Sequence, residues 1–220
     1  MVKFSYKSDD DDVEAWEAAA LSCARDAGLP VPEFRHVRID TYGSALIAKR
    51  FDRIGDERIG YISAAYLLHL HNLSQPYSFE MLASYMDSFC VSPCEDKASL
   101  FDRIALSIIL NIVDDHMRNY GFIRNDKGWS LAPLFDVSPD FRSQRIAGTP
   151  ILHNSTGFQR NKKELIQAAH CFGLTAQQAA GHYSQIQEAC SAFKDYANTY
   201  NIAEIDGNIL VKNIEQQLNE

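Results

Sequence analysis

The sequence NIVDDHMRNYGFI, Asn111–Ile123, gathers polar side chains directly after a segment that must be buried. Two carboxylates, an imidazole, a guanidinium and a carboxamide fall between Asp114 and Asn119. The preceding segment, Ser99–Val113, has the apolar periodicity of a helix that packs on a core, so these polar groups stand on a rigid support. The stretch is therefore either a polar loop whose acids pair with Arg118 at the surface, or an active site.

The spacing of Asp114 and Asn119 favours an active site. The two lie five positions apart, as in the catalytic loop of protein kinases, where the Asp accepts the proton of the substrate hydroxyl and the Asn holds a metal ion. Apolar residues on both sides of 125–128 predict a hairpin over 120–132, after which Asp136 ends an apolar strand. Because magnesium prefers oxygen ligands, Asn119 and Asp136 are the expected metal ligands and Asp114 the expected base.

Composition and charge restrict the class of protein. The 220 residues are 46% hydrophobic and 23% charged, which suits one sizeable core with a small lobe attached. A formal charge of −8 without any Lys/Arg block repels phosphate backbones, so direct nucleic-acid binding is not expected. No apolar leader or membrane-length apolar run occurs, so a cytoplasmic protein without membrane contact is expected. Five cysteines without a C-x-x-C pair predict reduced thiols.

Two patterns of periodicity divide the chain. Residues 1–53 alternate like short strands around one helix at 13–27, with strands expected at 2–6, 34–39 and 44–51. Residues 54–220 are mainly helical, with helices expected at 62–71, 78–89, 95–112, 162–172, 175–200 and from 207 onward. The prediction is an α+β fold in which a small antiparallel-sheet lobe packs on a larger helical lobe.

Four segments, taken in order, resemble the signature segments of a known family. They are DDHMRNYGF at 114–122, GWSLAPLFDVSP at 128–139, RFDR at 50–53, and residues 2–33. They are similar to the HipA-like serine/threonine kinases, the toxin components of bacterial toxin–antitoxin systems. The resemblance covers nearly the whole chain. It implies an atypical protein-kinase fold, the use of ATP and Mg²⁺, and a protein substrate, for which the family suggests an aminoacyl-tRNA synthetase.

The resemblance also implies a role for individual residues. Lys3 corresponds to the strand lysine that touches the ATP phosphates, and Glu17 to the helix acid near it. Asp114 corresponds to the catalytic base, and Asn119 and Asp136 to the magnesium ligands. Further nucleotide contacts are implied at the hinge of residues 49–53 and in the catalytic loop of residues 111–123, by Lys49, Arg50, Phe51, Asp52, His116 and Arg118.

The chain departs from the family pattern at two points. Relatives carry Asn two residues before the first Asp of the cluster, whereas this sequence has Ile112 there and Asn111 one place earlier. Relatives also carry a phosphate-covering loop before the strand lysine, whereas this sequence begins two residues before Lys3. We therefore expect a small partner protein to supply that sheet and loop, by strand addition at residues 2–6, and an antitoxin as a further partner.

Two other functions are compatible with the same residues. The first is a catalytically weak or dead pseudokinase that acts as a binding module, because no G-x-G-x-x-G or Walker stretch is present. The second is a metal-dependent phosphohydrolase, which would need two clustered transition metals. Its expected ligands are Asp114, Asp115, His116, Asp136 and His153.

Overall fold

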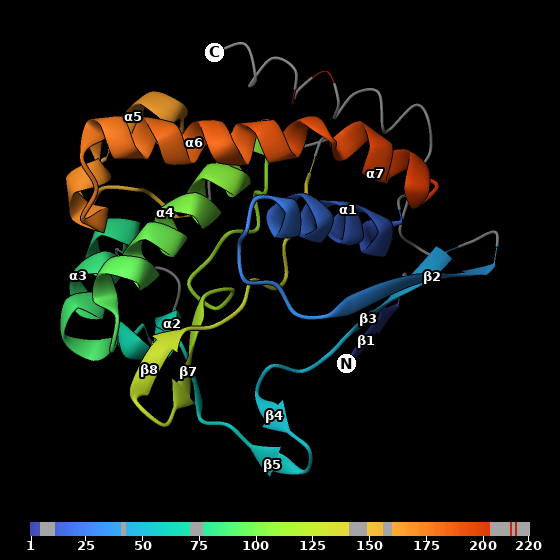
Figure 1. Ribbon diagram of the computed structural model, residues 1–220, viewed down its shortest axis with the longest axis horizontal. Coiled ribbons are helices and arrows are strands. Elements are labelled where there is room, and N and C mark those ends of the chain that lie inside the picture. Colours follow the sequence, from blue (N-terminus) through green and yellow to red (C-terminus); the bar gives the residue numbers. More distant parts are fainter. Residues whose placement is uncertain are drawn as a thin grey trace.

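The computed structural model describes residues 1–4, 12–40, 43–70, 77–140, 149–155, 160–202, 212 and 214. A small sheet with one helix lies at one end of the molecule, and a larger group of helices with a second small sheet forms the rest (Figure 1). This arrangement confirms the predicted α+β class. No helix within the described ranges is long and apolar enough to cross a membrane.

The first sheet is antiparallel and has the order β1-β3-β2. Its strands are β1 (Val2–Phe4), β2 (Phe34–Asp40) and β3 (Gly43–Ala48), close to the predicted ranges. The helix α1 (Val13–Asp26) begins where predicted. Its first turn is capped by the side chain of Asp12, which accepts a hydrogen bond from the backbone N–H of Ala15. Since α1 packs against both the sheet and the helical part, almost all of its surface is buried.

The chain reaches the helical part through a short hairpin, β4 (Arg53–Ile54) and β5 (Glu57–Arg58). It then forms β6 (Tyr61–Ser63), which pairs with the predicted hairpin of β7 (Gly121–Asn125) and β8 (Gly128–Leu131) in the order β6-β7-β8. The second sheet thus joins segments that lie about sixty residues apart in the sequence.

The predicted helix at 62–71 was wrong at its start. Residues 61–63 are extended because they bond to residues 121–123 of β7, and a pairing partner so far away leaves no local signal. The helix α2 covers only Ala64–Leu67 and is capped by the side chain of Ser63. Residue 71 lies outside the described residues.

The remaining helices surround a core built on α4, and α6 and α7 run along one side of the molecule over α4 and α1 (Figure 1). The predicted helix at 175–200 is divided at Ala192, and the one at 162–172 ends in a 3₁₀ turn. The helix predicted from 207 falls almost wholly outside the described residues. The helices are α3 (Phe79–Phe89), α4 (Pro93–Ile109), α5 (Lys162–Gln167), η1 (Ala169–Phe172), α6 (Ala176–Ser191) and α7 (Phe193–Thr199).

Two glycines give opposite expectations for the same substitution. Gly128 has φ of +139°, and an added Cβ would lie 2.5 Å from a methyl group of Val91. We expect Gly128→Ala to lower the free energy of unfolding by about 1–3 kcal/mol. Gly181 lies exposed within α6 with nothing near its Cβ position, so Gly181→Ala should raise stability by about 0.5–1 kcal/mol. Urea denaturation measures both changes in the free energy of unfolding. If both substitutions changed it in the same direction, this description of the hairpin would be contradicted.

Candidate active site

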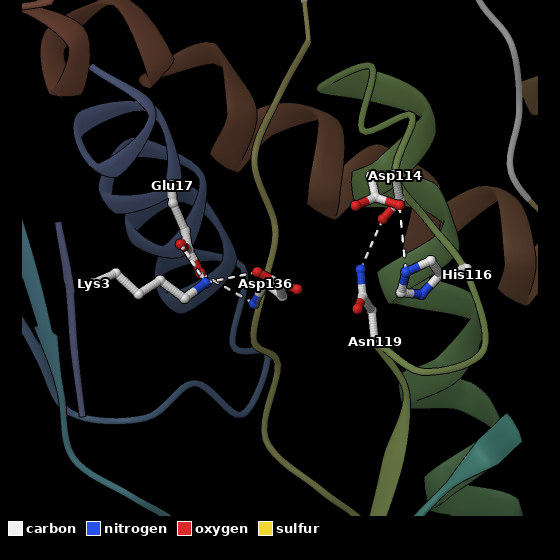
Figure 2. A network of polar contacts seen from close by, with 6 residues as sticks. All are labelled: Lys3, Glu17, Asp114, His116, Asn119 and Asp136. Carbon is white, nitrogen blue, oxygen red and sulfur yellow. Dashed lines mark hydrogen bonds and ion pairs between the residues drawn. The ribbon is translucent and has the colours of Figure 1, made fainter. Parts of the chain in front are cut away.

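A lysine and two carboxylates from three distant segments meet in one ionic cluster, which we call the Lys3 cluster (Figure 2). Lys3 Nζ lies 2.9 and 2.8 Å from the two carboxylate oxygens of Glu17, and 2.7 Å from Oδ1 of Asp136. The backbone N–H of Asp136 also donates to Glu17 Oε1 at 3.0 Å. The cluster therefore ties β1 and α1 to the segment that follows β8.

The local conformation of each residue explains why the three meet. Alternation along β1 leaves Val2 and Phe4 exposed and turns Lys3 toward the face covered by α1. Glu17 lies on α1 with its side chain only 5% exposed. Asp136 has φ of +59°, in the left-handed region that few non-glycine residues adopt. Such backbone conformations concentrate at functional sites, where surrounding contacts compensate for the strain.

Burial and charge act in opposite directions within the Lys3 cluster. Burial raises the pKa of Glu17 above its ordinary value and outweighs the opposing effect of the Lys3 ammonium group. Burial by itself would lower the pKa of Lys3, but Glu17 and Asp136 outweigh it and raise that pKa above its ordinary value. The charged form of Glu17 is therefore stabilised by Lys3, and that of Lys3 by the two carboxylates, since a buried charge without its partner is costly.

A cavity of about 220 Å³ opens beside Lys3 and Glu17. Three aromatic residues contribute to its wall: Phe51 packs on Phe135 with ring centroids 5.6 Å apart, and on Tyr61 at 6.1 Å. The four hinge residues with an implied nucleotide contact line the same cavity: Lys49, Arg50, Phe51 and Asp52. The structure therefore brings the predicted hinge and the predicted lysine together, and adds Tyr61 and Phe135, which the sequence analysis did not single out.

The hinge residues Lys49, Arg50 and Asp52 are held by ion pairs with nearby groups. Lys49 Nζ is 3.4 Å from a carboxylate oxygen of Glu33, and both side chains are exposed. Arg50 Nε donates to Asp52 Oδ1 at 2.7 Å, and the Arg50 guanidinium lowers the pKa of Asp52. These three charges are thus partnered, and the rest of the cavity lining includes the aromatic wall and the apolar side chains of Leu21, Leu46 and Ala48.

A second polar group lies in the loop between α4 and β7. The Asp114 side chain is 79% exposed, and one of its oxygens is 3.5 Å from His116 Nε2. Asn119 Nδ2 donates to the backbone carbonyl of Asp114 at 2.8 Å, which directs the side-chain oxygen of Asn119 away from that bond (Figure 2). Arg118 is exposed. The structure thus joins Asp114 to His116 and to Asn119.

Asn111 connects this loop to the segment that carries Asp136. Its φ is +50°, it follows the end of α4, and its side-chain amide donates to the backbone carbonyl of Asp140. The N–H of Asp140 returns a hydrogen bond of 3.1 Å to the Asn111 carbonyl. The sequence analysis noted that Asn111 lies one place earlier than the Asn of the family pattern. In the structure, Asn111 links the two segments through these hydrogen bonds.

Asp115 points away from Asp114 and into the protein. Its carboxylate accepts a hydrogen bond from the buried guanidinium of Arg160, and its backbone carbonyl accepts one from Thr149 Oγ1 at 2.7 Å. The sequence analysis missed Arg160 and Thr149, because nothing near either residue indicates a partner more than thirty positions away.

The donor atoms suit one kind of metal better than another. Asn119 and Asp136 carry the kind of oxygen donor that magnesium prefers. The structure bonds them to different groups, since Asp136 Oδ1 accepts from Lys3 Nζ and Asn119 Nδ2 donates to the Asp114 carbonyl, and no interaction joins the two in Figure 2. Over the described ranges, no three His, Cys, Asp or Glu side chains form a group that could hold a metal ion. The phosphohydrolase hypothesis needs such groups, and it also needs Asp115, which is committed to Arg160.

Two solved structures share this fold. A HipA chain from Shewanella oneidensis MR-1, in a complex of a toxin–antitoxin system with HipB and operator DNA, matches 99% of this chain with a TM-score of 0.72 and 17% identity. The Helicobacter pylori proinflammatory kinase CtkA matches 100% with a TM-score of 0.66 and 18% identity. The present chain spans 56% of that HipA chain and 84% of CtkA. Its fold is therefore that of the HipA-like kinases.

The sequence places the chain within this class. The HipA-like C-terminal domain family matches residues 1–193, and the chain belongs to that family. A search of curated proteins gave no match. The predicted family and fold are thus confirmed, whereas the roles of individual site residues stay predictions.

Proposed function

We propose that this chain is the catalytic unit of a serine/threonine protein kinase that transfers the γ-phosphoryl group of ATP to a protein hydroxyl. The observation that carries this proposal is the Lys3 cluster, in which Lys3 bonds to both Glu17 and Asp136 at the edge of an aromatic cavity. A kinase requires the ion pair between a strand lysine and a helix acid, with a metal-binding Asp in place. The cavity would take adenine, and the phosphates would extend to Lys3.

Asp114 is the proposed base. The substrate hydroxyl oxygen attacks the γ-phosphorus, the bond to the bridging oxygen breaks, ADP leaves, and the hydroxyl proton passes to Asp114. The exposure of Asp114 allows a protein side chain to reach it. Asn119 fixes the Asp114 backbone through its hydrogen bond to the carbonyl. Asn119 and Asp136 are the proposed magnesium ligands, and the ion when bound neutralises phosphate charge.

The remaining contacts are proposed from the lining of the cavity and from the loop. We assign the backbone of residues 49–51 to adenine recognition, with Asp52 fixing Arg50 beside it. His116 and Arg118 would contact the phosphates or the incoming substrate, since both lie in the loop that carries Asp114. We propose that the reaction takes place in the cytoplasm and that the substrate is an aminoacyl-tRNA synthetase, as the family suggests.

A partner chain is proposed to add a strand beside β1. β1 is an edge strand, because β3 pairs with one side of it and no described strand pairs with the other. Val2 and Phe4 of β1, and Ile47 beside Val2 on β3, are exposed apolar side chains on the same face. An open edge next to exposed apolar side chains suits strand addition. An antitoxin is the second proposed partner, since the similar HipA chain is in a complex with HipB.

Titration with ATP distinguishes a kinase from an inert binding module. We expect saturable binding by calorimetry that weakens when magnesium is withheld, because Asn119 and Asp136 alone offer the phosphates no positive charge. Radiolabel transfer should then be measured with and without the products of the neighbouring genes. Binding without any transfer under either condition would support the pseudokinase. Failure to bind ATP at all would count against the whole proposal.

A further inference from the structure

Asp114 and Asp115 are adjacent but face opposite environments. The side chain of Asp114 is 79% exposed, whereas that of Asp115 is 4% exposed. A buried carboxylate is costly unless it is paired and hydrogen-bonded. Asp115 has such a partner in the guanidinium of Arg160, whose side chain is itself only 5% exposed. A buried ion pair therefore lies directly behind the proposed base.

Arg160 holds the loop on both sides of Asp114. Nη1 donates to the Asp115 carboxylate, and Nη2 donates to the backbone carbonyl of Ile112 at 3.1 Å. A third bond, from Thr149 Oγ1 to the Asp115 carbonyl at 2.7 Å, fixes the same stretch. The backbone is thus held at Ile112, two residues before Asp114, and at Asp115, directly after it, while the Asp114 side chain takes no part in these bonds.

An aromatic pair supports the Arg160 guanidinium from the core. The guanidinium carbon lies 5.8 Å from the centre of the Phe79 ring, at the distance of a cation–π contact. Phe79 packs edge-on against Tyr120 with centroids 5.1 Å apart, and burial together with the nearby Asp115 carboxylate raises the pKa of Tyr120 well above its ordinary value. The Arg160 guanidinium therefore packs against an aromatic pair of the core, which restricts its movement.

We propose that Arg160 is a positioning residue for phosphoryl transfer, which sets the location of the Asp114 carboxylate through Asp115 and Ile112. This inference rests on the proposed kinase function. A displacement of about 1 Å at a reacting group can lower a rate by about 10²-fold. The planar fork of Arg reaches both acceptors at once, which the single ammonium group of Lys does not reproduce.

The test compares kcat and KM for Arg160→Gln, Arg160→Lys and Asp115→Asn, each corrected for the folded fraction. We expect kcat to fall about 10–100-fold in Arg160→Gln. The KM for ATP should stay within about twofold, because the lining of the ATP cavity is unchanged. Because Asp115 and Arg160 share one interaction, the double variant should lose about as much as the worse single variant, not the product of the two losses.

Two further variants keep the test decisive if the ion-pair variants fold poorly. Thr149→Val removes one hydrogen bond without changing the shape of the side chain, and should lower kcat about 3–10-fold. Gly128→Ala is the matched control, since it destabilises the protein at the hairpin without touching the loop. Its kcat per folded molecule should equal that of the wild type.

The possible outcomes separate this inference from the proposed function. If the wild type transfers phosphate and Asp114→Ala does not, a kcat in Arg160→Gln equal to wild type overturns the inference alone. Multiplicative losses in the double variant overturn it as well, since they would mean independent roles. If the wild type binds ATP but transfers nothing with or without its partners, the proposed function fails and the inference fails with it.

Discussion

Replacement of Asp114 by alanine is expected to lower the rate of phosphoryl transfer by about 10²–10⁴-fold. The substitution removes the group that would accept the hydroxyl proton. The protein should keep its stability, because the side chain is 79% exposed and its ion pair with His116 is a long one of 3.5 Å. The measurement is transfer of radiolabelled phosphate to the protein substrate at saturating ATP and magnesium.

The matched control for this experiment is Asp126→Ala. Asp126 is an exposed carboxylate in the turn of the β7–β8 hairpin, so its loss changes the net charge equally without altering the loop. Its activity should equal that of the wild type, and ATP affinity should be the same in all three proteins within about twofold. Comparable transfer by wild type and Asp114→Ala would remove Asp114 from the role of base.

Replacement of Lys3 by methionine is expected to impair both stability and ATP binding. Glu17 would stay buried without its cation, which should cost about 2 kcal/mol after allowance for the 28% exposure of Lys3. Loss of the ammonium group should also weaken ATP binding by about 10–100-fold, the value of one or two charged hydrogen bonds. Urea denaturation and calorimetric titration measure the two effects separately.

The stability loss in Lys3→Met should depend on pH in a defined direction. Burial already raises the pKa of Glu17, and removal of the Lys3 charge that opposes this effect raises that pKa further. Between the ordinary pKa of Glu and this raised value, the folded state binds more protons than the unfolded state, so stability falls as pH rises. The difference from wild type should therefore be larger at pH 7 than at pH 5.

Lys49→Met is the control for this prediction. Lys49 carries the same charge and pairs with Glu33, but both side chains are more than two-thirds exposed, so its loss should change stability little at either pH. A Lys3→Met variant that is as stable as wild type at pH 7 would mean that Glu17 is solvated or protonated. It would also remove the Lys3 cluster as the support for a kinase.

Local patterns predicted much of this protein. The strand at Lys3, the helix capped by Asp12 and the hairpin around 125–128 were located closely, because turn residues, capping residues and alternation act over a few positions. The five-residue spacing of Asp114 and Asn119 was read from the sequence as that of a catalytic loop, but their hydrogen bond depends on how the loop folds, since five extended residues can span about 17 Å. The boundaries of the longer helices were less accurate, as the break at Ala192 shows.

Other features had no local signal. Tyr61–Ser63 is a strand because β7 lies beside it, although its sequence alone favoured a helix. Tyr61 and Phe135 line the same cavity because of tertiary packing. Tyr61 is placed by the second sheet, and Phe135 lies in the segment after β8 that packs beside the first sheet. Which of the two adjacent acids faces solvent was also undecided, because a polar pair in a loop has no periodicity to orient it.

By itself, the sequence determined which functional groups are present and in what order: a carboxylate and a carboxamide five residues apart, a hairpin, and then a second carboxylate. The tertiary structure decided which of these groups meet, since Lys3 bonds to Asp136 across 133 positions and Arg160 to Asp115 across 45. Spacing and periodicity report what a residue needs within its own segment. The partner of a buried charge is set by how the chain packs, because the cost of burial is offset only by a group that packing brings within bonding distance.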